Sequence, residues 1–227
     1  MDLNQRVLDW EGCKNVRDLG GLRLRDGGVT RWGSVVRADN AARLTEAGWA
    51  DLYAYGIRTI ISLRTHGMVE DELDIKPPYP DIAVVRAPIE DITDQEFLQQ
   101  WAATGLWSTP LYYQDALRRW PARHAAAITA IAQAQPGGVL FHCVRGVDRT
   151  GIIALLLLTL AEVLPEEIIA DYALSADADR DELLAQKNTS VSEVVLGVIA
   201  GLDIERYLRL GGASEADLEA VRWRLVG

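Results

Sequence analysis

One short segment of the sequence combines a nucleophile with groups that bind an anion. It runs His142-Cys143-Val144-Arg145-Gly146-Val147-Asp148-Arg149-Thr150-Gly151, and it overlaps the stretch VLFHC (139–143), which is typical of a buried strand. The residues from Arg149 onward are apolar on every side and predict a buried helix. A loop that joins a strand to a helix N-terminus presents backbone amides and the positive end of a helix dipole, which together favour an anion.

The polar residues of this segment suit the steps of phosphoryl transfer. Cysteines near helix N-termini and beside cations ionise more readily than free cysteine, so Cys143 is the candidate nucleophile. Arg149 can bind two phosphate oxygens with its planar fork, and Thr150 can donate its hydroxyl to the sulfur when the thiolate departs. His142 is expected to orient the loop. The predicted phosphate-binding residues are Val144, Arg145, Gly146, Val147, Asp148 and Arg149.

Two aspartates are candidates for the general acid that cleavage of a phosphate ester requires. Asp91 follows a predicted strand (82–87), and its loop could bring it over the pocket; Glu90 and Asp94 make this segment generally acidic. Asp148 already lies in the predicted anion cradle beside Arg149. The sequence favours neither candidate over the other.

Strands and helices alternate through the first two thirds of the chain. Strands are predicted at 34–38, 57–63, 82–88 and 139–143, and a hairpin is predicted where LRL and VTR flank residues 25–28. Helices are predicted at 45–55 and, with breaks near 104–105 and 109–110, from 93 to about 135. Everything after the last strand is predicted to be helical, at 149–163, 166–174, further pieces to about 201, 204–210 and a last helix capped by Ser214. This order favours one α/β domain over residues 1–227, with a mainly parallel central sheet flanked by helices and extra C-terminal helices beside it.

The composition argues against several classes of function. A net charge of −10 would repel nucleic acid and an anionic membrane surface. The two cysteines and three histidines are scattered, so neither a metal nor another cofactor is predicted. The longest apolar run, Ile152 to Leu160, is too short to span a bilayer, so no integral membrane association is expected. The N-terminus lacks the apolar stretch of a signal peptide and predicts a cytoplasmic protein. Cys13 is interpreted as a core thiol.

Several segments resemble a known family. The run HCVRGVDRTG resembles the signature loop of the protein tyrosine phosphatase superfamily, in which His-Cys is followed by five residues and then Arg-Ser/Thr-Gly. Other segments resemble the bacterial and fungal tyrosine/serine phosphatase family, and the likeness covers nearly the whole chain. These segments are NVRDLGG (15–21), SLR (62–64), Asp171-Tyr172, Tyr207-Leu208 and Gly211. Arg17 and Asp18 of the first segment are expected to brace the N-terminal part of the chain.

The resemblance implies a phosphatase that hydrolyses phosphomonoesters through a phosphocysteine intermediate. Cys143 would be the nucleophile, Arg149 the phosphate binder, and Asp91 or Asp148 the proton donor. The implied substrate is a phosphoprotein or a small phosphomonoester, with phosphotyrosine favoured and phosphoserine or phosphothreonine as further substrates. No cofactor is implied.

Two positions depart from the family pattern. Members commonly carry Lys where this chain has Val147, and that Lys is associated with lipid phosphates, so its absence weakens a lipid phosphatase interpretation. Members usually carry Asp where this chain has Ser62. Three alternatives stay open: a phosphoinositide or small-molecule phosphatase, a phosphate-binding module without a working acid, and sulfur transfer on a rhodanese-like loop.

Overall fold

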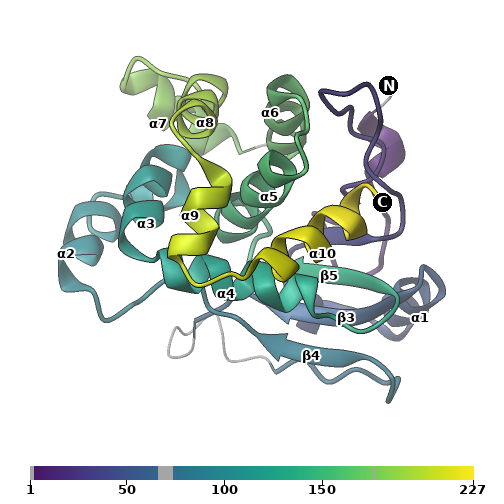
Figure 1. Cartoon of the computed structure of the whole chain (residues 1–227). Coiled ribbons are helices and arrows are strands. Elements are labelled where there is room, and N and C mark those ends of the chain that lie inside the picture. The colour runs from purple at the N-terminus through teal and green to yellow at the C-terminus, as the bar shows by residue number, and fades with distance from the viewer. Residues whose placement is uncertain (1–2, 66–73, 176) are drawn as a thin grey trace.

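The central feature of the molecule is a mixed β-sheet. A computed structural model describes residues 3–65, 74–175 and 177–227, and in this part of the chain five strands form one sheet in the order β1-β2-β5-β3-β4. Figure 1 shows β5, β3 and β4 side by side in that order. β1 is antiparallel to β2, and the other neighbours are parallel. The strands are β1 (Arg17–Asp18), β2 (Val35–Ala38), β3 (Ile57–Ser62), β4 (Ala83–Arg86) and β5 (Gly138–His142). The predicted α/β class with a mainly parallel sheet is confirmed.

Helices cover both faces of the sheet because alternate strand residues point to opposite sides. Val139 and Phe141 of β5 pack into the larger core cluster, whereas Leu140 between them packs into the other. The smaller cluster lies under α1 (Glu46–Ala54), which contributes Trp49 and Leu52 to it. The larger cluster contains side chains of α3 (Tyr113–Arg119), α4 (Pro121–Ala132), α5 (Asp148–Leu160) and α10 (Glu215–Leu225).

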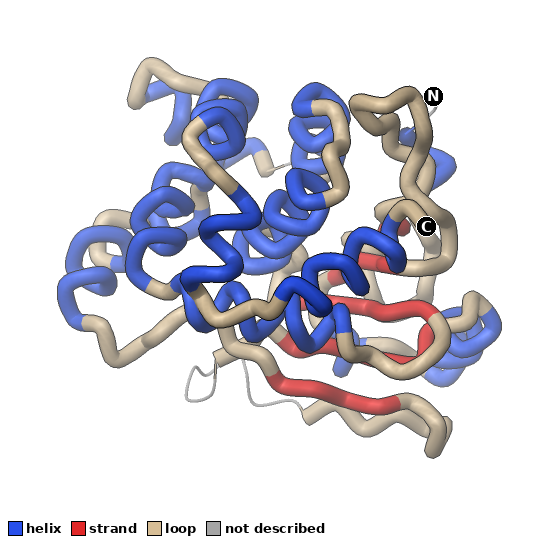
Figure 2. The backbone as a smooth tube through the Cα atoms, in the orientation of Figure 1, coloured by secondary structure: helices blue, strands red, loops and turns tan. Residues whose placement is uncertain are grey.

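The C-terminal part of the chain is helical, as predicted. After β5 come α5, α6 (Pro165–Ala173), α7 (Ala178–Gln186), α8 (Val191–Ala200), α9 (Ile204–Leu210) and α10. Figure 2 shows the strands gathered toward one side of the molecule and most helices on the other. α5 is buried along almost its whole length, which explains its uniformly apolar sequence. Among the described helices, none is both long and apolar enough to cross a bilayer.

Capping residues explain several helix starts. Thr45, Asp177, Ser190, Asp203 and Ser214 each accept a hydrogen bond from a backbone amide in the first turn of α1, α7, α8, α9 and α10, respectively. Pro121 and Pro165 stand at the first positions of α4 and α6, where the missing amide hydrogen costs nothing. Between β4 and α3 the chain forms only short turns, which include α2 (Gln95–Phe97) and a π-helical turn, Leu98–Ala102.

The predicted hairpin around residues 25–28 is only partly formed. Within the described residues, its arms meet in a single bridge, Arg23 to Val29, and the turn is closed by a hydrogen bond from the Leu24 amide to the Gly28 carbonyl. Leu24 also bridges to Val163 after α5. The arm therefore divides its backbone hydrogen bonds between two partners and does not extend into a strand. The short strand β1, which the sequence did not predict, occupies the sheet edge beside β2 instead.

Four strand ends meet at one edge of the sheet. Since β2, β3, β4 and β5 are parallel, their carboxyl ends lie together, which is where α/β proteins place their binding sites. Backbone hydrogen bonds continue the sheet order beyond the strands: Leu63 binds the His142 carbonyl at 2.9 Å, and Ala87 binds the Ser62 carbonyl at 2.9 Å. The loop that begins at Cys143 leaves the sheet at this edge.

Candidate active site

The loop from Cys143 to Val147 joins β5 directly to α5. Cys143 follows the last residue of β5, its side chain is buried with 3% of the residue exposed, and α5 begins at Asp148. His142 Nδ1 lies 2.9 Å from the Cys143 carbonyl oxygen, so this side chain supports the loop at its start, as predicted. The Asn40 amide binds the carbonyl oxygen of Val144 at 3.2 Å. The thiol is therefore buried at the start of the loop, beneath the residues that line the pocket, and is not itself part of that lining.

Two carbonyl groups of the loop are held by side chains from the N-terminal part of the chain. Asn15 Nδ2 donates to the carbonyl oxygens of both Arg145 and Gly146 at 3.1 Å, and Arg37 Nη2 donates to the Gly146 carbonyl at 2.9 Å. In a planar trans peptide the amide hydrogen points opposite to the carbonyl oxygen. Fixing these carbonyls therefore directs the amides of Gly146 and Val147 toward the other side of the loop.

Gly146 is required at its position for two reasons. Its φ is +70°, in the left-handed region that residues with a Cβ rarely adopt. A Cβ added here would lie 2.7 Å from the Asp39 amide nitrogen and 2.8 Å from the Ala38 carbonyl oxygen. The loop thus packs its backbone directly against the end of β2.

Behind the loop, one buried carboxylate forms ion pairs with three arginine side chains. Asp171 of α6 receives Arg17 Nε at 3.0 Å on one oxygen and Arg37 Nη1 at 2.6 Å on the other, and Arg6 also pairs with it. All four side chains are almost completely buried. Burial alone would raise the pKa of Asp171, but Arg17, Arg37 and Arg6 together hold it well below its ordinary value. This cluster fixes Arg37, which in turn holds the Gly146 carbonyl.

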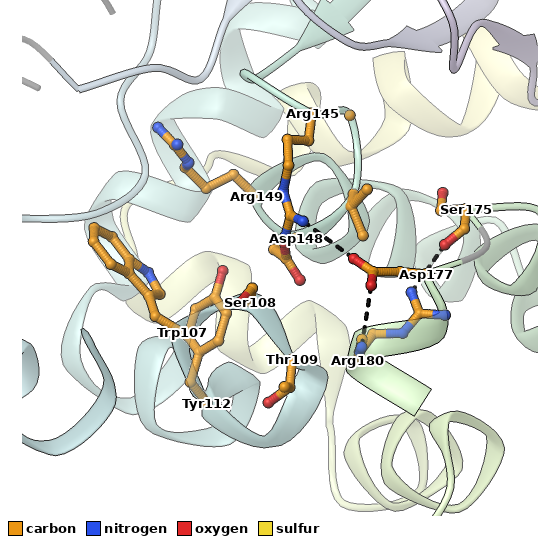
Figure 3. Close-up of polar contacts among 12 residues, drawn as sticks. Trp107, Ser108, Thr109, Tyr112, Arg145, Asp148, Arg149, Ser175, Asp177 and Arg180 are labelled. Atoms are coloured by element: carbon orange, nitrogen blue, oxygen red, sulfur yellow. Dashed lines mark hydrogen bonds and ion pairs between the residues drawn. The ribbon is translucent and has the colours of Figure 1, made fainter. Parts of the chain in front are cut away.

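A pocket of about 410 Å³ opens above the loop. Three of its lining side chains come from the loop and the first turn of α5: Arg145, Asp148 and Arg149. The opposite wall comes from the short turns before α3 and is formed by Ala102, Gly105, Trp107, Ser108 and Tyr112. Figure 3 shows Trp107 and Tyr112 on one side of Asp148, with Asp177 and Arg180 on the other.

Asp148 has a side chain that is 12% exposed and one oxygen that makes no hydrogen bond within the described residues. Its Oδ2 accepts from Arg145 Nη2 at 3.0 Å, whereas its Oδ1 is buried and has no hydrogen-bond partner among the residues that the structure describes. Burial raises the pKa of Asp148, and the Arg145 guanidinium opposes this effect. The carboxyl is therefore suited to retain a proton to higher pH than an exposed aspartate does, and it lines the pocket where such a proton could be used.

Arg149 extends from the first turn of α5 toward a second buried carboxylate. Its Nε lies 3.7 Å from Glu90 Oε2, and 12% of its side chain is exposed. Glu90 Oε1 accepts from Tyr112 Oη at 2.9 Å and from Trp107 Nε1 at 3.3 Å. Burial raises the pKa of Glu90, whereas the Arg149 guanidinium lowers it. One carboxylate thus contacts the predicted phosphate binder and both large aromatic residues of the pocket wall.

Comparison with models of protein families identifies the family of this chain. A family model described as the tyrosine phosphatase family matches residues 8–227. The chain belongs to the tyrosine phosphatase family. This confirms the resemblance drawn from the HCVRGVDRTG and NVRDLGG segments, and it makes the protein a hydrolase of this family.

Curated relatives of this phosphatase carry related names. It is 36% identical over 141 residues to a tyrosine-protein phosphatase of Nostoc commune, a match that covers 62% of this chain and 48% of the relative, so the chain spans about half of that protein. It is 27% identical to the triple specificity protein phosphatase PtpB of Mycobacterium tuberculosis, over 97% of this chain and 99% of the relative. Among solved structures, TpbA of P. aeruginosa in complex with phosphotyrosine matches with a TM-score of 0.41 and 14% identity, covering 80% of this chain and 88% of that one.

The structure separates the two acid candidates of this phosphatase. Asp91 Oδ2 pairs with Arg123 of α4 at 2.9 Å, and its Oδ1 accepts from the Thr93 hydroxyl at 2.7 Å. The hydrogen bonds from Thr93 are the main cause of a lowered pKa for Asp91. Within the described part of the chain, the pocket lining includes Asp148 and not Asp91. Only Asp148 is thus brought together with Arg149 at the pocket.

The remaining predicted residues of the loop occupy buried positions. Val144 and Val147 are buried, and the Val147 carbonyl accepts from the Gly151 amide at 2.7 Å as α5 begins. Thr150 is buried as well, and over residues 3–65, 74–175 and 177–227 its hydroxyl has no hydrogen-bond partner. The predicted bond from this hydroxyl to the Cys143 sulfur is therefore not formed in the structure. Its formation during turnover stays a prediction.

Sequence reasoning missed two residues of the phosphatase site. The strand pattern at 34–38 does not single out Arg37, although a charged residue between apolar neighbours of a buried strand signals a paired interior charge. The acidic segment around Asp91 does not single out Glu90, although Glu90 follows β4 closely enough to reach the carboxyl edge of the sheet. Arg17 was expected to brace the N-terminal segment, and it reaches further: it binds Asp171 and Ser175 next to the loop.

Proposed function

We propose that the chain is a protein phosphatase that hydrolyses phosphotyrosine through a phosphocysteine intermediate on Cys143. Phosphoserine and phosphothreonine are secondary substrates in this proposal. The supporting observation is the arrangement around Cys143: a buried thiol at the start of a loop whose carbonyls are held by Asn15 and Arg37, directly before the N-terminus of α5. Amides on the opposite side of the loop then face the phosphoryl group, and the dipole of α5 adds to their field.

In the first step, the Cys143 thiolate attacks phosphorus and the bond from phosphorus to the ester oxygen breaks. Asp148 donates its carboxyl proton to the departing oxygen, which leaves as an alcohol or phenol. In the second step, water attacks the phosphorus, the sulfur–phosphorus bond breaks, and the Asp148 carboxylate accepts a proton from that water. Inorganic phosphate and the thiolate are regenerated, so the cycle balances without a metal or an organic cofactor.

Arg149 holds the non-bridging oxygens of the phosphoryl group through both steps. Its guanidinium lines the pocket, and its Nε lies 3.7 Å from Glu90 Oε2. A planar fork can follow the three equatorial oxygens of the transition state, a geometry that a lysine ammonium does not reproduce. Thr150 is proposed to donate its hydroxyl to the leaving thiolate in the second step.

The shape of the pocket supports an aromatic phosphate ester as substrate. Cys143 is 3% exposed and lies beneath the pocket lining, so the proposal requires the phosphoryl group to reach past Asp148 and Arg149 to meet the sulfur. Trp107 and Tyr112 form the wall opposite Arg145 and Arg149 and offer ring surfaces to a phenyl group. Arg145 pairs with Asp148 and Asp177, so its charge is balanced by two carboxylates rather than directed at a second phosphate. This arrangement, together with Val147 in the loop, favours a singly phosphorylated substrate over a polyphosphorylated lipid headgroup.

Substrate and nucleophile can be tested in one set of assays. Wild-type protein is expected to release phosphate from a phosphotyrosine peptide faster than from a matched phosphoserine peptide or from phosphoinositide vesicles. Cys143→Ser is expected to abolish turnover while still binding phosphotyrosine peptide in calorimetry. Arg149→Lys is expected to lower kcat/KM by about 10²–10³, as loss of one transition-state donor does. Full turnover by Cys143→Ser would refute the proposed nucleophile, and faster release from phosphoinositides would refute the proposed substrate.

A further inference from the structure

Glu90 is a buried acid that connects three separate parts of the pocket. It lies beyond the end of β4, is 1% exposed, and its backbone carbonyl accepts from the Thr65 hydroxyl at 3.3 Å. In the described residues it does not line the pocket, yet its side chain contacts three groups that do: Trp107, Tyr112 and Arg149. Any effect that it has on substrate must therefore pass through those side chains.

The burial of Glu90 has a cost that its partners offset only in part, because Oε2 makes no hydrogen bond within the described residues. Moving a carboxylate out of water costs free energy unless the carboxylate is paired and hydrogen-bonded. Glu90 Oε1 accepts two hydrogen bonds from the aromatic wall, and Oε2 faces Arg149 Nε at 3.7 Å. Phe97 packs edge-on against the rings of both Trp107 and Tyr112, and Asp148 is the other charged side chain that acts on the pKa of Glu90. In such surroundings an ion pair orients its partners strongly, because little water screens it.

We propose that Glu90 is a positioning residue that holds the Arg149 guanidinium and the aromatic wall of Trp107 and Tyr112 in one fixed arrangement. The inference rests on the proposed function, in which Arg149 binds the phosphoryl group. Glu90 touches neither substrate nor reacting atoms. Its contact at Nε sets the direction of the guanidinium plane, while the same carboxylate sets the distance between that plane and the rings that receive the substrate's aromatic group.

The key variant is Glu90→Gln, which keeps the size of the side chain and an oxygen that can accept from Tyr112 but removes the charge beside Arg149. Misplacement of a catalytic group by about 1 Å can cost 10² in rate, so kcat is expected to fall by about 10- to 100-fold. KM is not expected to rise, because removing a negative charge beside Arg149 does not weaken its attraction for a dianion. A merely structural defect of the pocket would instead raise KM and lower kcat together.

A second readout tests whether Glu90 acts through Arg149. In an Arg149→Lys background, Glu90→Gln is expected to change kcat by less than about threefold, since the guanidinium that it orients is gone. The matched control is Glu96→Gln, which changes a glutamate that is 79% exposed and pairs with Arg119 at the surface. The control is expected to keep wild-type kcat and KM.

The outcomes separate this inference from the proposed function. If Cys143→Ser and Arg149→Lys lose activity as expected but Glu90→Gln keeps wild-type kcat, the positioning role is refuted and the proposed function stands. If Cys143→Ser keeps full activity, the proposed function itself fails. Should Glu90→Gln not fold, Glu90→Asp serves instead: it retains the charge, shortens the side chain, and is expected to lower kcat by a smaller factor. Wild-type kcat in Glu90→Asp would refute the role equally.

Discussion

Arg37 donates a hydrogen bond of 2.9 Å from Nη2 to the carbonyl oxygen of Gly146, a residue 109 positions later in the chain. Its other terminal nitrogen, Nη1, pairs with Asp171 at 2.6 Å. The Arg37 guanidinium thus connects β2 to the loop that follows β5 and to Asp171 of α6. The geometry of the anion cradle consequently depends on a charge cluster that lies outside the loop.

Replacing Asp171 is expected to destabilise the fold strongly. Asp171→Asn leaves Arg6, Arg17 and Arg37 buried without a charged partner at that position, and breaking a buried pair in this way costs about 3–5 kcal/mol. Asp81→Asn is the matched control, because Asp81 pairs with Arg58 while 49% exposed, and it should cost about 1 kcal/mol or less. Urea unfolding of both variants measures the difference. Equal stabilities would show that the cluster contributes nothing.

The same cluster predicts a loss of stability in acid. The pKa of Asp171 is held well below its ordinary value, so its contribution is complete above the unfolded-state pKa, which is about 3.9, and is lost as the pH falls through the folded-state value. The free energy of unfolding of the wild type should therefore drop steeply below about pH 4. Asp171→Asn should lack this part of the drop. Parallel curves for the two proteins between neutral pH and pH 3 would contradict the assignment.

The two acid candidates are expected to differ in their pH–rate profiles. The pKa of Asp148 is raised by burial, so the proton that it donates is lost only as the pH rises through that higher value, which produces the basic limb. Asp148→Asn should flatten this limb and lower kcat by about 10²–10⁴ for a phenyl ester with a poor leaving group. The loss should be much smaller for an aryl phosphate whose leaving group departs without a proton.

Asp91→Asn provides the comparison for this experiment. Asp91 is paired with Arg123 and Thr93 rather than directed into the pocket, and its pKa is lowered, so it is ionised where the acid must be protonated. We expect its profile to match that of the wild type. A flattened basic limb in Asp91→Asn, with an unchanged limb in Asp148→Asn, would reverse the assignment.

Gly146→Ala is expected to damage the loop more than an equally strained glycine substitution elsewhere. Its Cβ would lie within 2.8 Å of backbone atoms of Ala38 and Asp39, so the loop must move. Since displacement of catalytic groups by about 1 Å can cost 10² in rate, kcat/KM should fall at least about tenfold. Gly27→Ala is the control: its φ is +92° and its Cβ would meet nothing described within 4 Å, so it adds strain without a clash. Steady-state kinetics of the two variants tests this prediction. Equal kcat/KM values would show that the close contact of Gly146 with Ala38 and Asp39 does not matter for activity.

The two cysteines are expected to differ in their reaction with iodoacetamide. Burial and the neighbouring Asp39 raise the pKa of Cys13 to about 12, so its thiolate is scarce at neutral pH. Alkylation at pH 7 should therefore label Cys143, be slowed by inorganic phosphate, and be absent from Cys143→Ser. Peptide mass spectrometry locates the label. Preferential labelling of Cys13 would contradict the proposed roles of both thiols.

Much of the placement of strands and helices along the chain followed from local patterns in the sequence. The β-branched run at 57–63, the cap at Thr45 and the proline at 165 each act over a few residues, so their effects can be recognised without tertiary contacts. The break between α3 and α4 at Trp120 was not predicted. The hairpin predicted around residues 25–28 formed only in part, although its prediction also rested on a local pattern. Its turn chemistry was present, but Leu24 bridges to Val163, a partner more than a hundred residues away.

The class of chemistry could be recognised from the sequence alone, because the spacing from Cys143 to Arg149 and Thr150 lies within one strand–loop–helix junction whose geometry is local. Chain packing was needed to show which aspartate lines the pocket, which carboxylate lies beside Arg149, and what holds the loop carbonyls. Those relationships join Asp148 to Arg145, Glu90 to Arg149 and Arg37 to Gly146, and two of the three link segments that are far apart along the chain. Desolvation, which controls the pKa values of Asp148 and Glu90, arises only when the chain has packed, so no local pattern encodes it.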